Sequence, residues 1–275
     1  MPGKLLRNVA LGDWLAEAPF GLAMSSGFFS FYAHTGVFSA LLARGLRPSH
    51  VSGSSAGALV TGAWASGAEP AELAAFLTGM RREDFWDPSI GAGLLAGKKF
   101  DALLRKMLPI HRIEDCHVPV RISVFDILAR KTAVLDRGDL AKAIRASCAV
   151  PAMFQPVWID RRPYWDGGIL DRPGIAGVPP GRLLFHHIAL PAPWSRASTP
   201  LVIPTRADMV TLVLDDLPRP SPFHLDAGRQ AMLAAQAATE RALDQPIDHD
   251  LVRRSVRGAR CAPSTPRGPV LPSRA

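Results

Sequence analysis

The spacing of apolar residues changes repeatedly along the first half of the chain. Short apolar segments predict two buried strands, at 20–26 and 49–53. Segments in which apolar residues recur with helical spacing follow them, at 34–46, 56–67 and 69–83. Strands that alternate with helices in this way are typical of α/β proteins, in which the sheet is largely parallel.

The second half of the chain continues this alternation and adds further strands. Strands are predicted at 119–127, 131–136, 182–190 and 208–217, with two strand edges around a turn within 157–168. Helices are predicted at 138–149 and 225–245, with a short amphipathic helix at 5–18. No internal repeat interrupts the pattern, so we expect one main folded unit.

Composition agrees with a single folded core that is followed by a basic tail. The chain has 275 residues, 48% of them hydrophobic, and a formal net charge of +8. Six arginines and no acid follow Asp250, and without them the chain has 26 basic and 24 acidic residues. The positive charge therefore belongs to the tail, so we expect no nucleic-acid partner. Salt-dependent binding of nucleic acid by the tail alone is a weaker alternative.

Cysteine usage and the apolar segments bear on where the protein works. Cys116, Cys148 and Cys261 are far apart and show neither a disulfide framework nor zinc spacing. Residues 1–20 lack the pattern of a signal peptide, and no apolar run reaches the about 18 residues of a membrane-spanning helix. We therefore expect a cytoplasmic protein that needs no metal and no cofactor.

One short stretch has the pattern of a nucleophile elbow. Gly53-Ser54-Ser55-Ala56-Gly57 lies between a predicted strand and a predicted helix. A sharp turn there would expose the Ser55 hydroxyl, and small neighbours are needed because side chains would meet the adjacent strand and helix. The helix N-terminus would direct free N–H groups toward the serine. The same residues also fit a structural turn whose serine has no chemical role.

Four stretches, in order, resemble the patatin-like phospholipase family. They are a loop at Ser25–Phe28 ahead of a helix, the serine elbow, Ala143–Val157, and Tyr164–Pro173 with the signature Asp166-Gly167-Gly168. The segment Gly93–Leu108 is also similar to the middle region of the family. The resemblance covers about residues 20–190 and implies a three-layer α/β/α sandwich with the elbow between a strand and a helix.

The resemblance implies a serine acyl hydrolase that works with a Ser–Asp dyad. Ser55 would be the nucleophile and Asp166 the base, and Gly167 and Gly168 would let the backbone approach the elbow. A carboxylate with a reference pKa of about 3.9 is a weak base, so it must lie within hydrogen-bond reach of the serine. The substrate would be a phospholipid, lysophospholipid or acylglycerol, and a transient contact with a membrane surface is expected.

The chain departs from the family pattern in the first loop. The family has three glycines, a variable residue, a basic residue and a glycine; aligned on Gly36, only Gly27 remains, and Ser30 stands at the basic position. Backbone N–H groups can still form the oxyanion hole, and we expect those of Gly27, Phe28 and Ala56 to do so. The aromatic run 27–32 fits either the wall of an acyl pocket or core packing.

Three alternatives to this interpretation remain open at the level of sequence. His186 or His187 follows Asp166 in the order of a histidine-containing triad, although their segment reads as an interior strand. The altered glycine loop also fits a patatin-like fold that binds lipid or protein without turnover. Residues 85–100 fit either a lid at a membrane interface or a buried connection.

These patterns divide the chain into four parts. We expect a helical lead-in at 1–19, the acyl hydrolase domain at 20–215, a C-terminal helix packed on it within 216–250, and a disordered Arg- and Pro-rich tail at 251–275.

Overall fold

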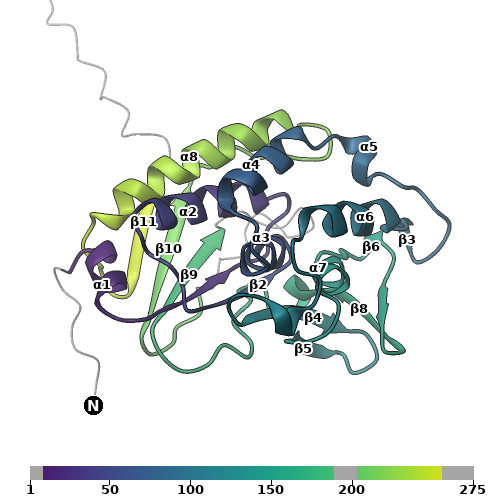
Figure 1. Cartoon of the computed structure of the whole chain (residues 1–275), viewed down its shortest axis with the longest axis horizontal. Helices are drawn as coiled ribbons and strands as arrows, with labels where there is room; N and C mark the ends of the chain where they lie inside the picture. Colours follow the sequence, from purple (N-terminus) through teal and green to yellow (C-terminus); the bar gives the residue numbers. More distant parts are fainter. Residues whose placement is uncertain (1–8, 189–202, 256–275) are drawn as a thin grey trace, which may run out of the picture.

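A computed structural model describes residues 9–188 and 203–255, which form a mixed α/β fold around a nine-stranded sheet (Figure 1). The strands of this sheet are β1 (Gly21–Met24), β2 (His50–Ser54), β4 (Val120–Asp126), β5 (Lys131–Leu135), β7 (Val157–Ile159), β8 (Arg162–Asp166), β9 (Leu183–Ile188), β10 (Met209–Asp215) and β11 (Leu251–Ser255). Their order is β11-β10-β9-β1-β2-β4-β8-β7, and β5 pairs with β4. All pairs from β11 to β4 are parallel, whereas β5, β7 and β8 pair in the antiparallel sense. The predicted α/β class with a mainly parallel central sheet is therefore confirmed.

Eight α-helices and a small second sheet complete the described part of the chain. The helices are α1 (Leu11–Glu17), α2 (Phe31–Ala43), α3 (Ala56–Ala65), α4 (Pro70–Gly79), α5 (Arg82–Phe85), α6 (Lys98–Met107), α7 (Leu140–Ser147) and α8 (Asp226–Leu243). Short 3-10 turns lie at Ile113–Asp115 and Gly167–Ile169. The second sheet pairs β3 (Gly93–Leu95) with β6 (Ala152–Phe154) in parallel.

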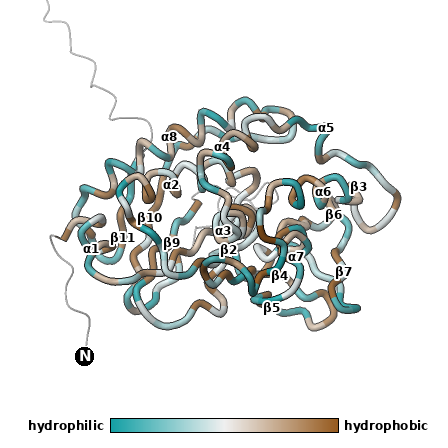
Figure 2. Tube along the Cα trace, in the orientation of Figure 1, coloured by the Kyte–Doolittle hydropathy of each residue, from teal (hydrophilic) through white to brown (hydrophobic). Residues whose placement is uncertain are grey.

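The core is built on the helices whose sequences are apolar all round. Every residue of α3 is buried, and α2 buries nine of its thirteen residues between α8, α4 and α3. A helix without a continuous polar face is stable only where neighbours cover every side. This explains why α2 and α3 are buried between other elements. Figure 2 shows hydrophobic residues concentrated around α3 and the strands beside it.

Strand β4 sets the positions of the two sequence motifs. Ser123 on β4 is in register with Ser54 on β2, and the next residue, Val124, is in register with Asp166 on β8. The serine elbow and the Asp-Gly-Gly turn are therefore neighbours across one strand, although they are far apart in the sequence.

Three predicted boundaries differ from the structure. The helix predicted at 69–83 is two helices, α4 and α5, because Met80 and Arg81 are extended. The N-terminal helix begins at Leu11, and residues 5–8 of the prediction lie outside the described part. The tail predicted to be disordered from residue 251 is wrong at its start, since Leu251–Ser255 pairs with β10 as an edge strand.

Candidate active site

The Ser55 turn has the backbone conformation of an elbow. Ser55 stands between β2 and α3 with φ 53° and ψ −119°, values that a residue other than glycine rarely adopts. The two motif glycines are required by close packing: a Cβ on Gly53 would lie 2.4 Å from the carbonyl carbon of Gly57, and one on Gly57 would lie 2.0 Å from the carbonyl oxygen of Met24. The turn therefore tolerates no larger residue at either position.

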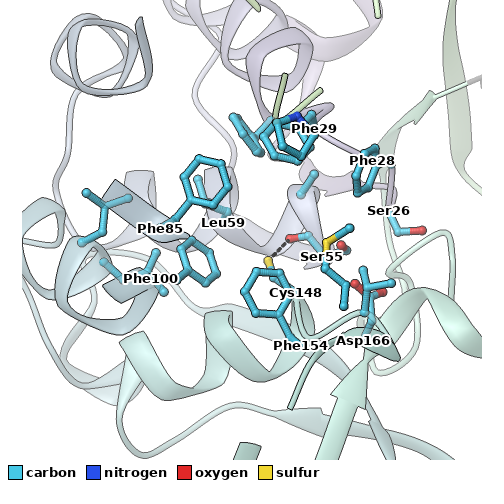
Figure 3. Close-up of a pocket in the computed structure, with 18 of the residues that line it drawn as sticks. Ser26, Phe28, Phe29, Ser55, Leu59, Phe85, Phe100, Cys148, Phe154 and Asp166 are labelled. Atoms are coloured by element: carbon cyan, nitrogen blue, oxygen red, sulfur yellow. Dashed lines mark hydrogen bonds between the residues drawn. The ribbon is translucent and has the colours of Figure 1, made fainter. Parts of the chain in front are cut away.

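The Asp166 carboxyl lies at the end of β8, where the chain turns into Gly167 and Gly168. Its Oδ1 accepts a hydrogen bond of 2.7 Å from the Gly168 amide, and the side chain is buried. A Cβ on Gly167 would lie 2.2 Å from the carbonyl oxygen of Ser123, so only glycine allows the turn to pack against β4. These contacts fix the carboxyl toward the serine elbow, as Figure 3 shows.

Burial changes the acidity of this carboxyl. Desolvation raises the pKa of Asp166 to about 7, although hydrogen bonding from the Ser55 side chain and the Gly168 amide acts in the opposite direction. A group with a pKa near neutrality can both take and return a proton at physiological pH. Burial therefore shifts the pKa of Asp166 toward neutrality.

Ser55 and Asp166 share the wall of a largely apolar cavity of about 290 Å³. Seven phenylalanines line it, from the loop before α2 and the first residue of α2, from α4 to α6 and from β6: Phe28, Phe29, Phe31, Phe76, Phe85, Phe100 and Phe154. Arg172 is the only lysine or arginine among the described residues of the lining. Figure 3 shows Ser55, Cys148 and Asp166 close together, with Phe85 and Phe100 farther along the cavity. The space beside the two polar side chains therefore suits a hydrophobic chain.

The aromatic run 27–32 borders this cavity, and one of its residues has an unusual backbone conformation. Phe29 has φ 54°, and its ring packs against Phe28, Phe31 and Phe85 with centroid distances of 5.0, 5.3 and 5.9 Å. These ring contacts hold a conformation that glycine would adopt more easily. The loop therefore lines the cavity and packs at its margin, so each of the two interpretations of the aromatic run describes part of it.

The three residues predicted to supply the oxyanion hole all lie at the cavity. Gly27, Phe28 and Ala56 are in its lining, and Ala56 is the first residue of α3. Among the described residues, their amides donate to no backbone carbonyl. All three residues therefore lie in the wall of the cavity that Ser55 also lines.

The candidate histidines lie outside the lining of the cavity. His34 Nε2 donates to the Ser25 carbonyl at 2.8 Å, so the neutral ring accepts through Nδ1 from Nδ1 of His186, also at 2.8 Å. Neither His186 nor His187 is among the residues lining the cavity, and burial lowers the pKa of both. The structure therefore places neither His186 nor His187 beside Ser55, and a triad with either histidine has no geometric support in the described residues.

The segment 85–100 has both buried and exposed apolar residues. Phe85, Leu95 and Phe100 line the cavity from inside, whereas Ile90 and Leu94 are exposed. Trp86 lies between these extremes and also lines the cavity. The segment is thus a wall with an apolar outer edge.

Sequence reasoning missed the residues that hold the elbow and the charge beside it. Ser147 accepts the Ser55 amide hydrogen bond, and the Cys148 thiol donates to the Ser55 carbonyl. Both lie within the matched stretch 143–157, which was the available signal. Arg172 follows the Asp-Gly-Gly turn, but nothing in the local pattern places its side chain at the cavity.

No group of three or more His, Cys, Asp or Glu side chains in the described ranges is arranged to hold a metal ion. Within 9–188 and 203–255, no helix combines the length and the apolar character needed to cross a bilayer.

Comparisons with known proteins point to one family. A family model described as patatin-like phospholipase matches residues 22–178. Uncharacterized NTE family proteins of Mycobacterium bovis and Mycobacterium tuberculosis are each 40% identical over 153 residues, 54% of this chain and 42% of theirs. A second such protein of Mycobacterium tuberculosis is 29% identical over 169 residues, 59% of this chain and 28% of its own. The chain therefore spans less than half the length of these curated relatives.

A solved structure shares the fold. The crystal structure of VipD from Legionella pneumophila superposes with a TM-score of 0.51, covering 83% of this chain and 67% of that one at 16% sequence identity. This likeness supports the expected α/β/α sandwich.

Proposed function

Because this chain belongs to the patatin-like phospholipase family, a family of lipid acyl hydrolases, we propose that it hydrolyses carboxylic esters of lipids with Ser55 and Asp166. The observation that carries the proposal is the meeting of these two side chains in the wall of one apolar cavity, through register on β4. Phospholipids, lysophospholipids and acylglycerols are the substrate classes that fit such a cavity.

In the proposed reaction, Ser55 Oγ attacks the ester carbonyl carbon while the Asp166 carboxylate takes the hydroxyl proton. The amides of Gly27, Phe28 and Ala56 stabilise the oxyanion of the tetrahedral intermediate. The C–O bond to the alcohol then breaks, and the protonated Asp166 gives its proton to the leaving oxygen. Water attacks the resulting acyl-Ser55 ester with Asp166 again as base, which releases the fatty acid and restores the serine.

The exposed apolar edge of the cavity supports a transient contact with a membrane surface. Ile90, Leu94 and Phe223 are more than half exposed, and Phe223 lies against Arg82, whose guanidinium also covers Trp86. Apolar and aromatic side chains beside a cation suit the interface of a lipid bilayer. A substrate could leave the bilayer there and enter the cavity.

A fluorophosphonate probe tests the proposed chemistry directly. We expect the wild type to be labelled at Ser55, and Ser55→Ala to be unlabelled and inactive on p-nitrophenyl esters and lysophospholipids. Asp166→Asn should lower kcat by at least about a thousandfold because the base is lost. Ser66→Ala is a control, since Ser66 is a buried serine at the far end of α3. Full activity in Ser55→Ala would refute the proposal.

The altered loop supports one alternative, a module that binds lipid without turnover. Phenylalanines stand at positions where the family has glycines, and Phe29 holds a left-handed backbone. This alternative predicts that folded wild type takes no label and turns over no ester, and that Ser55→Ala binds lipid as well as the wild type does.

A further inference from the structure

Both backbone polar groups of Ser55 are held by consecutive side chains at the end of α7. The Ser55 N–H donates to Ser147 Oγ at 2.8 Å, and the Cys148 thiol donates to the Ser55 carbonyl at 3.2 Å. The helical amide of Leu59 donates to the same carbonyl at 3.1 Å. Helix α3 cannot supply an acceptor for the Ser55 N–H, because the first N–H groups of a helix have no partner within it.

The backbone conformation of Ser55 is one that these hydrogen bonds can stabilise. A residue with φ 53° and ψ −119° is strained, and such strain persists only where the surroundings fix it. Ser147 is fully buried, so no water competes for its hydroxyl. The Ser147 hydroxyl also donates to the Ser123 carbonyl at 2.6 Å, which fixes the direction of its lone pairs toward the Ser55 amide.

The same chain of bonds continues to the segment that follows Asp166. The Ser123 hydroxyl donates to Asp171, whose carboxylate also accepts from the amides of Gly174 and Ala176 at 3.1 and 3.0 Å. Ser123 stands in register with Ser54, one residue before Ser55, and its carbonyl oxygen is the atom against which Gly167 packs. The hydroxyls of Ser147 and Ser123 therefore link the elbow to the turn that carries the base.

We propose that Ser147 is a positioning residue, which holds the strained backbone of Ser55 so that its hydroxyl faces Asp166. The role rests on the proposed function. In Ser147→Ala the Ser55 amide loses its acceptor in a buried site, which favours relaxation of the turn. Small displacements of a reacting atom are costly, about a hundredfold in rate for 1 Å. Cys148 contributes less, because a thiol is a weak donor and Leu59 already serves the carbonyl.

Ser66 offers a matched control for this substitution. Its side chain is also fully buried, and its hydroxyl also donates one bond to a backbone carbonyl, that of Ala63 at 2.7 Å. We expect Ser147→Ala to lower kcat on a soluble ester ten- to a hundredfold with KM changed less than threefold. Ser66→Ala should keep kcat within twofold at a similar loss of Tm, and Ser147→Thr, which retains the hydroxyl, should recover most of the rate. Equal kcat in Ser147→Ala and Ser66→Ala would overturn the proposal.

Hydrogen exchange separates the failure of this proposal from failure of the proposed function. The peptide that contains Ser55 should exchange at least tenfold faster in Ser147→Ala than in wild type, and at the wild-type rate in Ser66→Ala. This result would support the positioning role even if the wild type hydrolyses no ester. Unchanged exchange of the elbow in a folded Ser147→Ala protein would overturn it.

Discussion

The acidity of Asp166 predicts how activity depends on pH. Burial raises the pKa of this carboxyl to about 7, and only the ionised form can accept the Ser55 proton. We therefore expect kcat/KM on a soluble ester to rise about tenfold per pH unit below the pKa and to level off above it. A profile that is flat between pH 5 and 8 would contradict the assignment of Asp166 as the base.

The same shift predicts an effect on stability. A carboxyl whose folded pKa lies above its unfolded value is most favourable when protonated, so its contribution is full below about pH 4 and is lost as pH rises through about 7. Asp166→Asn should therefore raise Tm at pH 8 relative to the wild type and leave it nearly unchanged at pH 3.5. Thermal unfolding at the two pH values measures the difference.

Buried histidines predict sensitivity to acid. Burial lowers the pKa of His187 to about 4, with nearby Arg172 and Arg253 acting in the same direction, and both ring nitrogens lack a hydrogen-bond partner among the described residues. A base with a lowered folded pKa contributes stability above about pH 6.5 that is lost as pH falls toward 4. Near pH 5.5 we expect His187→Leu to reduce the pH dependence of unfolding free energy by about 1.4 kcal/mol per pH unit. Urea titrations between pH 5 and 6 test this, and an unchanged slope would contradict it.

At the scale of single residues, the sequence could predict the candidate catalytic residues but not the residues that hydrogen-bond to the backbone of Ser55. Small neighbours at fixed spacing indicated an elbow at Ser55, whereas the roles of Ser55 and Asp166 as a dyad were implied by the resemblance to the patatin-like family. Ser147 and Cys148 each contact the Ser55 backbone through one hydrogen bond, which requires no particular neighbours in the sequence. The positions of such residues follow only from the register of α7 against β4.

Helix α2 approaches the backbone of α8 closely at Gly36. A Cβ on Gly36 would lie 2.1 Å from the Met232 carbonyl oxygen, which belongs to the backbone of α8 and cannot rotate away. Gly36→Ala should therefore destabilise the protein by about 1–3 kcal/mol, as expected for overpacking. Gly79→Ala is the control, since nothing lies within 4 Å of its added methyl group. Equal urea midpoints for the two variants would contradict the close approach.

At the scale of elements, the sequence predicted types better than ends. Strand β11 was taken for tail because the chain is rich in Arg, Pro and Ser from residue 251 onward. In the structure only Val252 of its five residues is buried. Arg253 pairs with Asp215 on β10 through both side-chain nitrogens that face it, and such charges are common on edge strands. The break between α4 and α5 has no proline, so helical spacing alone carried the prediction across Met80 and Arg81.

At the scale of the whole molecule, strand pairing brings together motifs that are far apart in the sequence. Strand β4 receives β2 on a parallel ladder and β8 on an antiparallel one, and this mixed pairing brings the elbow and the Asp-Gly-Gly turn to one place. The cavity then extends away from the sheet to residues of α4, α5 and α6, and the exposed side chains of Ile90 and Leu94 lie in the connection between α5 and α6. The sheet therefore positions the proposed catalytic residues, whereas the segment 70–107, seen in Figure 1, borders the cavity through which we propose that lipid reaches them.

This division predicts that access and chemistry can be separated by mutation. Ile90 and Leu94 are exposed and lie outside the lining of the main cavity, so Ile90→Asp/Leu94→Asp should keep turnover of a soluble short-chain ester within twofold. On phospholipid vesicles we expect at least a tenfold loss, because each apolar side chain that enters the bilayer contributes about 1.5–3 kcal/mol when fully buried, and a carboxylate opposes entry. Vesicle flotation and release of fatty acid measure binding and turnover.

Leu128→Asp supplies the comparison, because Leu128 is 65% exposed but lies in the turn between β4 and β5. If the edge around Ile90 is the surface that meets the membrane, this third carboxylate should leave vesicle binding and turnover unchanged. Equal losses in the two variants would mean that added negative charge, rather than the position of the apolar edge, determines binding. The edge would then have no special role, and lipid would have to reach Ser55 by another opening of the cavity.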